Sequence, residues 1–274
     1  MGTKLLTGVP RSGTTLCCYL LNQYENTVAL HEPIKPELFV GTRQEALGLI
    51  REFSDAARSR LLEKKTIITK QRNGKLPTNP VKDDHGALRK EAVDLGIIKI
   101  NKALDEKFTL FVKHNALFTA LLEELVDDFD VYALVRNPMS VLVSWHTVDL
   151  PVHFGQLPMG EKFDESLSSQ LEDAASILQK QLTILAWFYK RYDHLIESSR
   201  IIRFEDVLSS EGSVLQSIFN HSSEKIHFDR EERANRLSLA SLKQLHHGLL
   251  SHGSVAEPFY SSSEIDAEYH RIME

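Results

Sequence analysis

The stretch KLLTGVPRSGTTLCCYLLNQY, residues 4–24, decides the fold. Its first part, residues 4–9, is mostly apolar and predicts a short buried strand. Its last part, residues 14–24, has the apolar spacing of a helix. Gly8 stands near the end of the strand, and Gly13 lies in the turn that follows. The stretch therefore predicts a strand, a glycine loop and a helix in direct succession.

The same alternation of strand and helix continues along the chain. Apolar runs predict further strands at residues 27–31, 108–113, 130–135 and 200–204. Helical patterns occur at residues 43–63, 115–126, 138–148, 171–196 and 205–219, and residues 150–170 are expected to form a loop rich in Pro and Gly. Strands that alternate with helices form a mostly parallel sheet covered on both faces. We therefore predict one α/β domain over residues 1–274, with a central sheet flanked by helices.

The composition argues against several classes of protein. The 274 residues carry a net charge of −6 and have an isoelectric point near 6.1, whereas nucleic-acid binders usually present a basic face. No run of about 18 apolar residues occurs, so no membrane span is expected. The two cysteines, Cys17 and Cys18, are adjacent, which argues against a disulfide framework and for a reducing compartment. We expect a cytoplasmic protein with neither nucleic-acid nor membrane partners.

Residues 64–90, KKTIITKQRNGKLPTNPVKDDHGALRK, differ from the rest of the chain. They are polar and basic, and Gly and Pro interrupt them. Two interpretations remain open: a mobile lid over the functional site, or an ordinary surface insertion.

The glycine loop has the chemistry of an anion site. Backbone N–H groups and the following helix N-terminus favour negative charge, and Ser12, Thr14 and Thr15 add hydroxyl groups. The spacing of the two glycines matches an ATP-binding phosphate loop, but Thr14 replaces the lysine that reaches the β- and γ-phosphates. Arg11 instead places a cation on the loop itself. This arrangement suits a ligand with one 5′-phosphate and a second group joined to it.

A second motif, VYALVRNPMSVLVSWH, covers residues 131–146. A strand ends in Arg136, a helix begins at a proline, and Ser144 follows Arg136 by eight residues. An arginine at the carboxyl end of a parallel strand points into the crevice where such sheets bind ligands. Arg136 and Ser144 are therefore candidates to hold a second phosphate.

Together, GVPRSGTTL (residues 8–16) and RNPMSVLVSW (residues 136–145) resemble the cofactor signature of the sulfotransferases that use 3′-phosphoadenosine-5′-phosphosulfate (PAPS). The resemblance covers roughly residues 4–36, 108–148 and 183–215, and it implies a P-loop NTPase-like three-layer domain. It implies that the 5′-phosphosulfate is held by Pro10, Arg11, Ser12, Gly13, Thr14 and Thr15, and the 3′-phosphate by Arg136 and Ser144.

The resemblance also places two candidate general bases. In LHEP, residues 30–33, Glu32 matches the catalytic glutamate of tyrosylprotein-type and several bacterial relatives. In FVKHN, residues 111–115, His114 stands where the cytosolic enzymes have a catalytic histidine. We expect Glu32 to be the base, with His114 as the alternative. Lys113 is expected to contact the transferring sulfuryl group or the bridging oxygen, beside Arg11.

The resemblance is weaker toward the C-terminus. In RIIRFEDVL, residues 200–208, Phe204 either packs in the core or lies near the adenine. The basic clamp that the cytosolic enzymes place on the 3′-phosphate is missing, because no Lys or Arg lies between Lys243 and Arg271. Ser254, a backbone group or the basic residues 64–90 are candidate substitutes.

Three histidines in this region raise the question of a metal site. They are His246, His247 and His252, and their spacing is poor for one helix face. No metal site is expected.

These features predict a PAPS-dependent sulfotransferase that acts on a hydroxyl or amine of a small molecule and releases adenosine 3′,5′-bisphosphate. Tailoring of a secondary metabolite fits the chain, and an alkaloid toxin is one candidate acceptor. Residues 35–41, 70–85 and 146–160 are expected to line the acceptor pocket.

Two other classes remain as alternatives. The first is an atypical P-loop small-molecule kinase, which the threonine at position 14 and the lack of a clear Walker-B aspartate disfavour. The second is a non-catalytic nucleotide-binding protein, which would need neither Glu32 nor Lys113.

Overall fold

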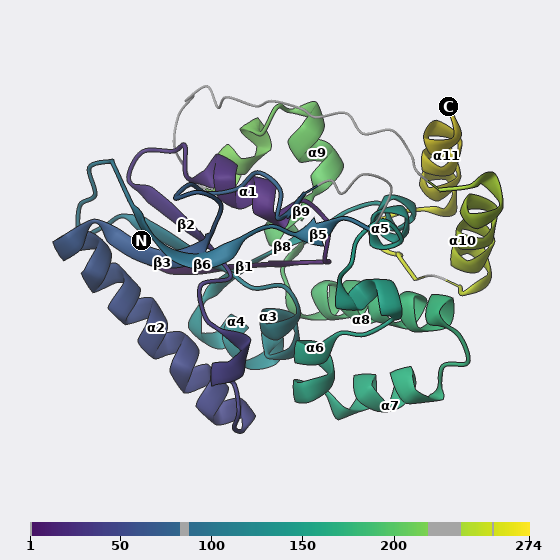
Figure 1. Ribbon diagram of the computed structural model, residues 1–274, viewed down its shortest axis with the longest axis horizontal. Coiled ribbons are helices and arrows are strands. Elements are labelled where there is room, and N and C mark those ends of the chain that lie inside the picture. Colours follow the sequence, from purple (N-terminus) through teal and green to yellow (C-terminus); the bar gives the residue numbers. More distant parts are fainter. Residues whose placement is uncertain (1, 83–87, 219–236, 254) are drawn as a thin grey trace.

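A sheet of five parallel strands forms the centre of the molecule, in the order β2–β7–β1–β8–β9 (Figure 1). The computed structural model describes residues 2–82, 88–218, 237–253 and 255–274. The sheet strands are β1 (Thr3–Gly8), β2 (Thr27–His31), β7 (Thr109–Lys113), β8 (Asp130–Val135) and β9 (Ile201–Arg203). The prediction of an α/β domain with a central parallel sheet flanked by helices is confirmed.

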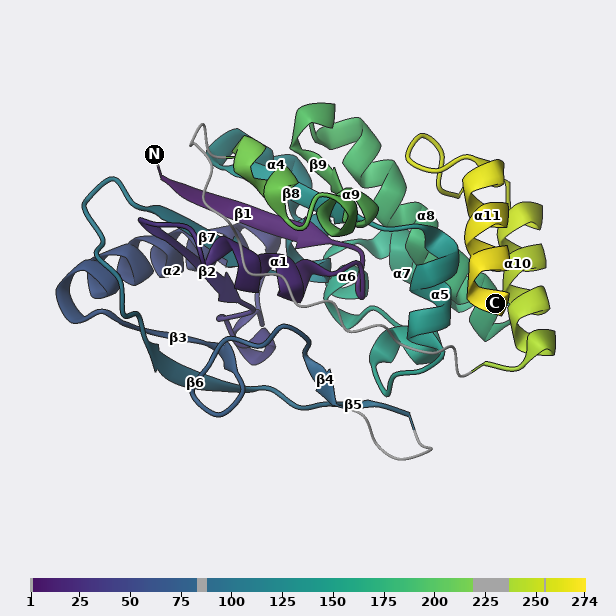
Figure 2. The same cartoon turned by 90° about the horizontal axis from the view of Figure 1, so that it is seen from above.

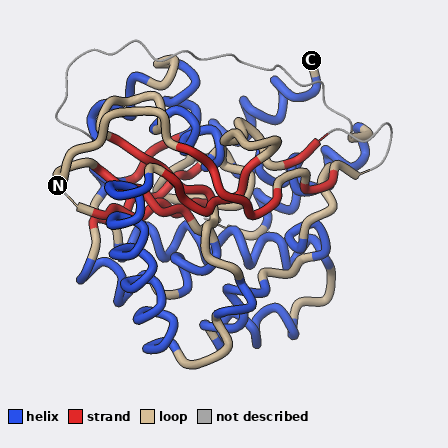
Figure 3. The backbone as a smooth tube through the Cα atoms, turned by 60° about the vertical axis from the view of Figure 1, so that its left-hand side comes forward, coloured by secondary structure: helices blue, strands red, loops and turns tan. Residues whose placement is uncertain are grey.

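Apolar side chains cover both faces of the sheet. Neighbouring residues of β1 point to opposite faces, so that Leu5 joins one buried cluster and Leu6 the other. Helices α1 (Thr14–Leu21) and α9 (Phe204–Ser209) pack on the Leu6 face, while α3 (Ala116–Ala120), α4 (Leu122–Asp128) and α8 (Ile177–Leu195) pack on the Leu5 face. Figure 3 shows the strands enclosed by helices. Both faces are buried, as a parallel sheet requires.

The remaining helices surround this core. Helix α2 (Arg43–Lys64) begins with a capping box between Thr42 and Glu45. The C-terminal helices α10 and α11 pack against each other and against α5. The other helices are α5 (Pro138–Trp145), α6 (Pro158–Phe163), α7 (Glu165–Asp173), α10 (Leu239–Ser251) and α11 (Ser262–Met273), with 3-10 turns at Pro36–Leu38, Pro151–Phe154, Ser198–Arg200 and Ser213–Ile218. Within the described residues, no helix is long and apolar enough to cross a membrane.

Two small antiparallel pairs lie beside the main sheet (Figure 2). Strand β3 (Thr66–Gln71) pairs with β6 (Asp94–Lys99), and β4 (Val81–Lys82) pairs with β5 (Lys90–Glu91). The backbone N–H of His31 donates to Thr69 Oγ1 at 2.8 Å and so ties β3 to β2. The sequence predicts no strand in residues 64–90. The structure instead places β3, β4 and the start of β5 there, in the part of this segment that it describes.

Four further expectations about helices are wrong. The helix expected over residues 171–196 is interrupted between α7 and α8, and the described part of residues 205–219 holds α9 and a 3-10 turn instead of one helix. The helix expected over residues 115–126 is divided at Leu121 into α3 and α4. Residues 150–170 form a 3-10 turn, α6 and part of α7 rather than a loop. The turn and α6 begin at Pro151 and Pro158, because proline is well tolerated in the first helical turn. Helices of one or two turns are too short to show a clear apolar period.

Candidate functional site

A cavity of about 990 Å³ opens at the carboxyl ends of the central strands. This is the end of an open parallel sheet where ligands bind. The cavity is lined by the glycine loop and by the residues that end β2, β7 and β8, together with side chains from the β3–β5 region and the segment 150–159. Its volume is at the upper end of the range for a single ligand, roughly 300–1,000 Å³.

The glycines of the loop are sterically required. Gly13 has φ +89°, and a Cβ atom there would lie 2.1 Å from the ring of Phe204. A Cβ atom on Gly8 would lie 2.5 Å from Thr14 Cγ2. Thus the loop is packed tightly against α9 and against its own helix. Phe204 is buried and also lines the cavity, so it packs in the core, and its place near the adenine stays a prediction.

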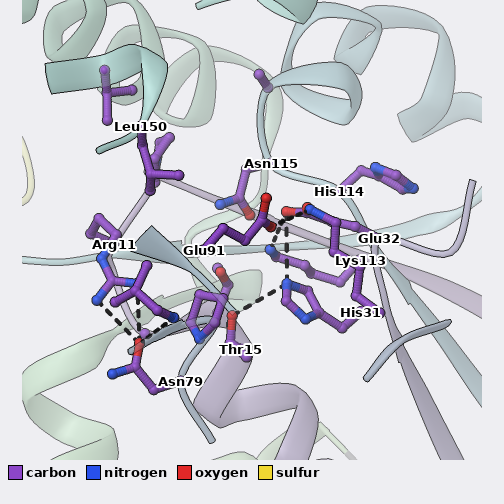
Figure 4. A pocket seen from close by; sticks show the side chains of 18 of the residues that line it. Arg11, Thr15, His31, Glu32, Asn79, Glu91, Lys113, His114, Asn115 and Leu150 are labelled. Carbon is purple, nitrogen blue, oxygen red and sulfur yellow. Dashed lines mark hydrogen bonds and ion pairs between the residues drawn. The ribbon is translucent and has the colours of Figure 1, made fainter. Parts of the chain in front are cut away.

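Arg11 contacts three other parts of the chain, and Figure 4 shows its contact with Asn79. It has a left-handed backbone, with φ 73°. Its Nε donates to Ser144 Oγ at 3.2 Å, and both terminal nitrogens lie 3.3 Å from Asn79 Oδ1. Its carbonyl oxygen accepts from Arg136 Nη1 at 3.2 Å. The two sequence motifs therefore meet at Arg11. The contact of Arg11 with Asn79 connects the segment 64–90 to both motifs.

The pair expected for the second phosphate is arranged differently from the prediction. Ser144 bonds to Arg11 and is not one of the described residues that line the cavity. Arg136 does line it, lies over the ring of Phe204 at 5.0 Å and donates to Ser140 Oγ at 3.4 Å. Burial lowers the pKa of Arg136, and Glu205 and Glu268 partly offset this by their negative charge.

Arg271 also lines the cavity, although the sequence gives it no role. It comes from α11, where Glu268 binds its Nε and Nη2 at 2.7 Å each. Glu268 in turn accepts from Ser140, which also accepts from Arg136. A chain of polar contacts thus joins the two arginines. Ser254, one of the proposed substitutes for the clamp, lies outside the described residues.

Glu32 is the centre of the charged group at the ends of β2 and β7. Its Oε1 accepts from Lys113 Nζ at 2.6 Å, and its Oε2 accepts from Lys70 Nζ at 2.8 Å. His31 Nε2 lies 3.9 Å from Oε1. Burial raises the pKa of the Glu32 carboxyl, but Lys113, His31 and Lys70 outweigh burial and hold this pKa well below its usual range. Glu32 is therefore an anion at neutral pH.

His114 lines the same cavity but is held as a neutral hydrogen-bond acceptor. Burial lowers its pKa to about 3. Its Nε2 accepts the backbone N–H of Ile34 at 3.3 Å, so the hydrogen of the neutral ring is on Nδ1. Neither nitrogen is then placed to take a proton from a substrate. This geometry favours Glu32 over His114 as the base.

Lys70 belongs to the segment 70–85 that is expected to line the acceptor pocket, but the sequence gives it no part in the charged group around Glu32. It extends from β3 and reaches Glu32, and its ammonium also lies 2.5 Å from Glu91 Oε1. Burial lowers the pKa of Lys70, but the two glutamates raise it above its ordinary value overall. A lysine in a polar, irregular segment carries no periodic signal, and only the contact of Thr69 on β3 with His31 on β2 brings it to the site.

The other predicted loop residues divide into two groups. Ser12 is buried, and its Oγ donates to the carbonyl of Leu134 at 3.3 Å, so it holds the loop to β8. Thr15 lies at the cavity wall, with its Oγ1 3.4 Å from His31 Nε2. Those that line the cavity are Pro10, Arg11, Gly13, Thr14 and Thr15.

The expected acceptor segments each contribute to the cavity. Pro36 comes from the first segment, residues 35–41. Lys70, Asn79 and their neighbours come from the second, and Leu150, Val152 and Met159 are among those from the third. The described lining residues of the segment 64–90 lie beside the glycine loop, because Asn79 contacts Arg11. That this segment moves as a lid stays a prediction.

The C-terminal histidines and the cysteines have structural surroundings. His246 Nε2 lies 2.6 Å from Asp266 Oδ1, and its ring stacks on Tyr269 with 4.2 Å between centroids. No group of three or more metal-ligating side chains occurs within the described residues. Cys17 and Cys18 are buried residues of α1 itself, and burial raises the pKa of both thiols.

Comparisons with known proteins place the chain near two crystal structures. No protein-family model matches the chain, and no curated protein matches it. A sulfotransferase from Alicyclobacillus acidocaldarius aligns with a TM-score of 0.49 and 14% identity, over 99% of both chains. A sulfotransferase from Mycobacterium tuberculosis H37Rv aligns with a TM-score of 0.34 and 11% identity, over 98% of this chain and 76% of the other. Both sequence identities and both TM-scores are too low to support an inference about the function of this chain.

Proposed function

We propose that this chain is a sulfotransferase that moves a sulfuryl group from PAPS to a hydroxyl or amine of a small-molecule acceptor. One observation carries the proposal. The glycine loop, with threonine where an ATP site needs lysine, shares its cavity with an anionic Glu32 held between Lys113 and Lys70. A P-loop kinase needs the loop lysine to reach the β- and γ-phosphates, and Thr14 carries no charge that could replace it.

The polar residues of the cavity fit the donor. The loop amides, the N-terminus of α1, Thr14 and Thr15 suit the 5′-phosphosulfate. Arg136 and Arg271 line the same cavity and suit the 3′-phosphate, because two guanidinium groups can donate to one phosphate. Arg271 takes the place of the missing C-terminal clamp in this proposal. Phe204, whose ring lies 5.0 Å from the Arg136 guanidinium, offers an aromatic surface in the same cavity.

Each catalytic role falls to a named side chain. The donor, when bound, supplies a sulfuryl group whose bond to the 5′-phosphate breaks as its bond to the acceptor forms. Glu32 accepts the proton that the acceptor oxygen or nitrogen loses. Lys113 and Lys70 are then released from the carboxylate charge and can offset negative charge at the sulfuryl oxygens. Arg11 and Arg136 hold the charge of adenosine 3′,5′-bisphosphate.

The low pKa of Glu32 is compatible with a base that acts during bond formation. An acceptor hydroxyl becomes far more acidic once its oxygen begins to bond to sulfur, so a weakly basic carboxylate suffices. Its low pKa also keeps Glu32 in the anionic form throughout the neutral range.

Thermal unfolding with nucleotides tests this proposal. Adenosine 3′,5′-bisphosphate, ADP and ATP are compared at equal concentrations. A ligand at about 100 times its Kd stabilises the fold by roughly 2.7 kcal/mol. We expect selective stabilisation by the bisphosphate, followed by transfer of radiolabelled sulfate from PAPS to an acceptor. Equal or greater stabilisation by ATP would support the kinase instead.

A further inference from the structure

We infer that the acceptor is an uncharged, mainly apolar alcohol or phenol, bound against one apolar wall of the cavity. This inference rests on the proposed function and names its acceptor class. The wall is formed by Ala116, Leu117, Leu150, Val152, Pro158 and Met159. This acceptor class differs from an alkaloid toxin, the candidate acceptor named from the sequence, whose basic nitrogen would carry a positive charge.

The wall has a uniform composition. Every cavity-lining residue that the structure describes from α3 and from residues 150–159 is apolar. These residues come from α3, from the 3-10 turn Pro151–Phe154 and α6, and from the positions directly before the turn and before α6. Helices α3 and α6 pack against each other, so the wall is continuous. Such a surface binds a ligand by removing apolar area from water, at about 25 cal/mol per Å².

The chain brings this wall directly to the catalytic carboxylate. Lys113 ends β7 and bonds to Glu32 at 2.6 Å, and Ala116 follows only three residues later at the start of α3. The glycine loop and the two arginines of the donor site come from other elements, at the ends of β1 and β8 and on α11. A molecule against the wall therefore lies next to Glu32 while the loop holds the donor.

The charges of the cavity disfavour a cationic acceptor. Among the described lining residues the carboxylates are Glu32 and Glu91, and both already pair with lysine. An ammonium group against the wall would lose its hydration without gaining a carboxylate partner, which is costly. An uncharged apolar acceptor has no ionic hydration to lose when it binds against the wall.

Two phenols of nearly the same shape test this inference. 4-Propylphenol and tyramine carry the same phenol, and tyramine has an ammonium group where the other has a methyl group. With adenosine 3′,5′-bisphosphate present, we expect calorimetry to show at least about tenfold tighter binding of 4-propylphenol. With PAPS, kcat/KM for sulfation is expected to favour it by a similar factor.

A charge placed on the wall should reverse this preference. Met159 is half-buried, so the fold can accept Met159→Glu, and Met159→Leu serves as the apolar control. Leu239→Glu adds the same charge at an exposed site on α10 that does not line the cavity. Met159→Glu is expected to raise tyramine binding relative to 4-propylphenol, whereas both controls should keep the wild-type ratio.

The outcomes separate the two proposals. If the bisphosphate binds but the two phenols bind equally, or tyramine binds better, or neither binds, the acceptor inference is wrong and the donor assignment stands. If the bisphosphate does not stabilise the protein, the proposed function is wrong. Binding of the two phenols without nucleotide then still measures whether the wall prefers the uncharged molecule, and an absent preference overturns the inference.

Discussion

Glu32 and Lys113 form an ion pair across two neighbouring strands, with 2.6 Å between Oε1 and Nζ. The residue before Glu32, His31, is in register with Lys113 where β2 and β7 pair. The side chain of Lys113 is only 2% exposed, whereas that of Glu32 is 25% exposed and faces the cavity. The carboxylate therefore stabilises a buried cation on one side and meets the ligand space on the other.

Substitution Glu32→Gln should remove activity and reduce stability. Loss of a general base lowers the rate by roughly 100- to 10,000-fold. Removing one partner of a buried pair typically costs about 3–5 kcal/mol, and the partial exposure of Glu32 places the expected loss at or below the lower end. Sulfuryl transfer and urea unfolding measure the two effects.

Glu91→Gln is the matched control for this prediction. Glu91 also binds Lys70, but it is 41% exposed and does not contact Lys113 in the described structure. We expect this variant to keep most of the stability and activity. If Glu32→Gln retained wild-type transfer, Glu32 would not be the base, and His114→Ala would be measured next.

Arg271→Met should weaken the preference for a 3′-phosphate. The affinity for adenosine 3′,5′-bisphosphate is expected to fall by about tenfold, at the low end for a charged hydrogen bond because Arg271 is 61% exposed. The affinity for AMP, which lacks the 3′-phosphate, should change little. Titration calorimetry with both nucleotides measures the difference.

Arg203→Met provides the comparison for Arg271. Arg203, at the end of β9, pairs at 2.6 Å with Glu264 of α11, the helix that also carries Arg271. Arg203 itself does not line the cavity. The variant removes a similar ion pair while leaving the donor site intact. Equal losses of bisphosphate affinity in both variants would show that α11 acts only through its packing.

The sheet and the glycine loop could be predicted because their signals are local. Buried parallel strands are continuous apolar runs, and a loop such as residues 8–15 has fixed spacing. The carboxyl ends of parallel strands then meet at one edge, which brings Glu32, Lys113 and Arg136 together without further information.

The remainder of the site depends on long-range packing. Lys70 and Asn79 reach the cavity only because β3 attaches to the edge of β2, and Arg271 only because α11 packs on α5. Ser144 follows Arg136 by about two helical turns, yet its hydroxyl accepts from Arg11. Helical spacing determines which residues share a face, but not which partner each side chain meets.

The stability of the fold should decrease in mild acid because of buried neutral histidines. The folded pKa of His114, about 3, is below the ordinary value near 6.5. Below about pH 6.5 the unfolded chain binds a proton at this position and the folded chain does not, so stability is lost as the pH falls. The loss approaches about 1.4 kcal/mol per pH unit for one such histidine.

His114→Gln isolates this contribution. Glutamine keeps an oxygen that can accept from the backbone N–H of Ile34, but it does not titrate. Between pH 6.5 and 5 the free energy of unfolding should fall less steeply in the variant, by about 1 kcal/mol per pH unit. His31, whose pKa burial also holds well below its usual range, keeps its own share in both proteins. Identical slopes would mean that His114 binds its proton equally well in the folded and the unfolded chain.

Gly13→Ala should damage the donor loop through contact with Phe204. The added Cβ atom would lie 2.1 Å from the Phe204 ring, and the alanine would have to adopt a φ of +89°. The left-handed backbone alone costs about 1–2 kcal/mol, and the contact adds to it. We expect lower stability and loss of bisphosphate binding.

A double variant, Gly13→Ala with Phe204→Ala, tests whether the contact causes the loss. The contact is then absent, but the backbone strain remains. The double variant should therefore be more stable than the sum of the two single effects predicts, by about 1 kcal/mol or more. Urea unfolding of the four proteins measures this coupling, and strictly additive effects would mean that the loop relaxes away from the ring.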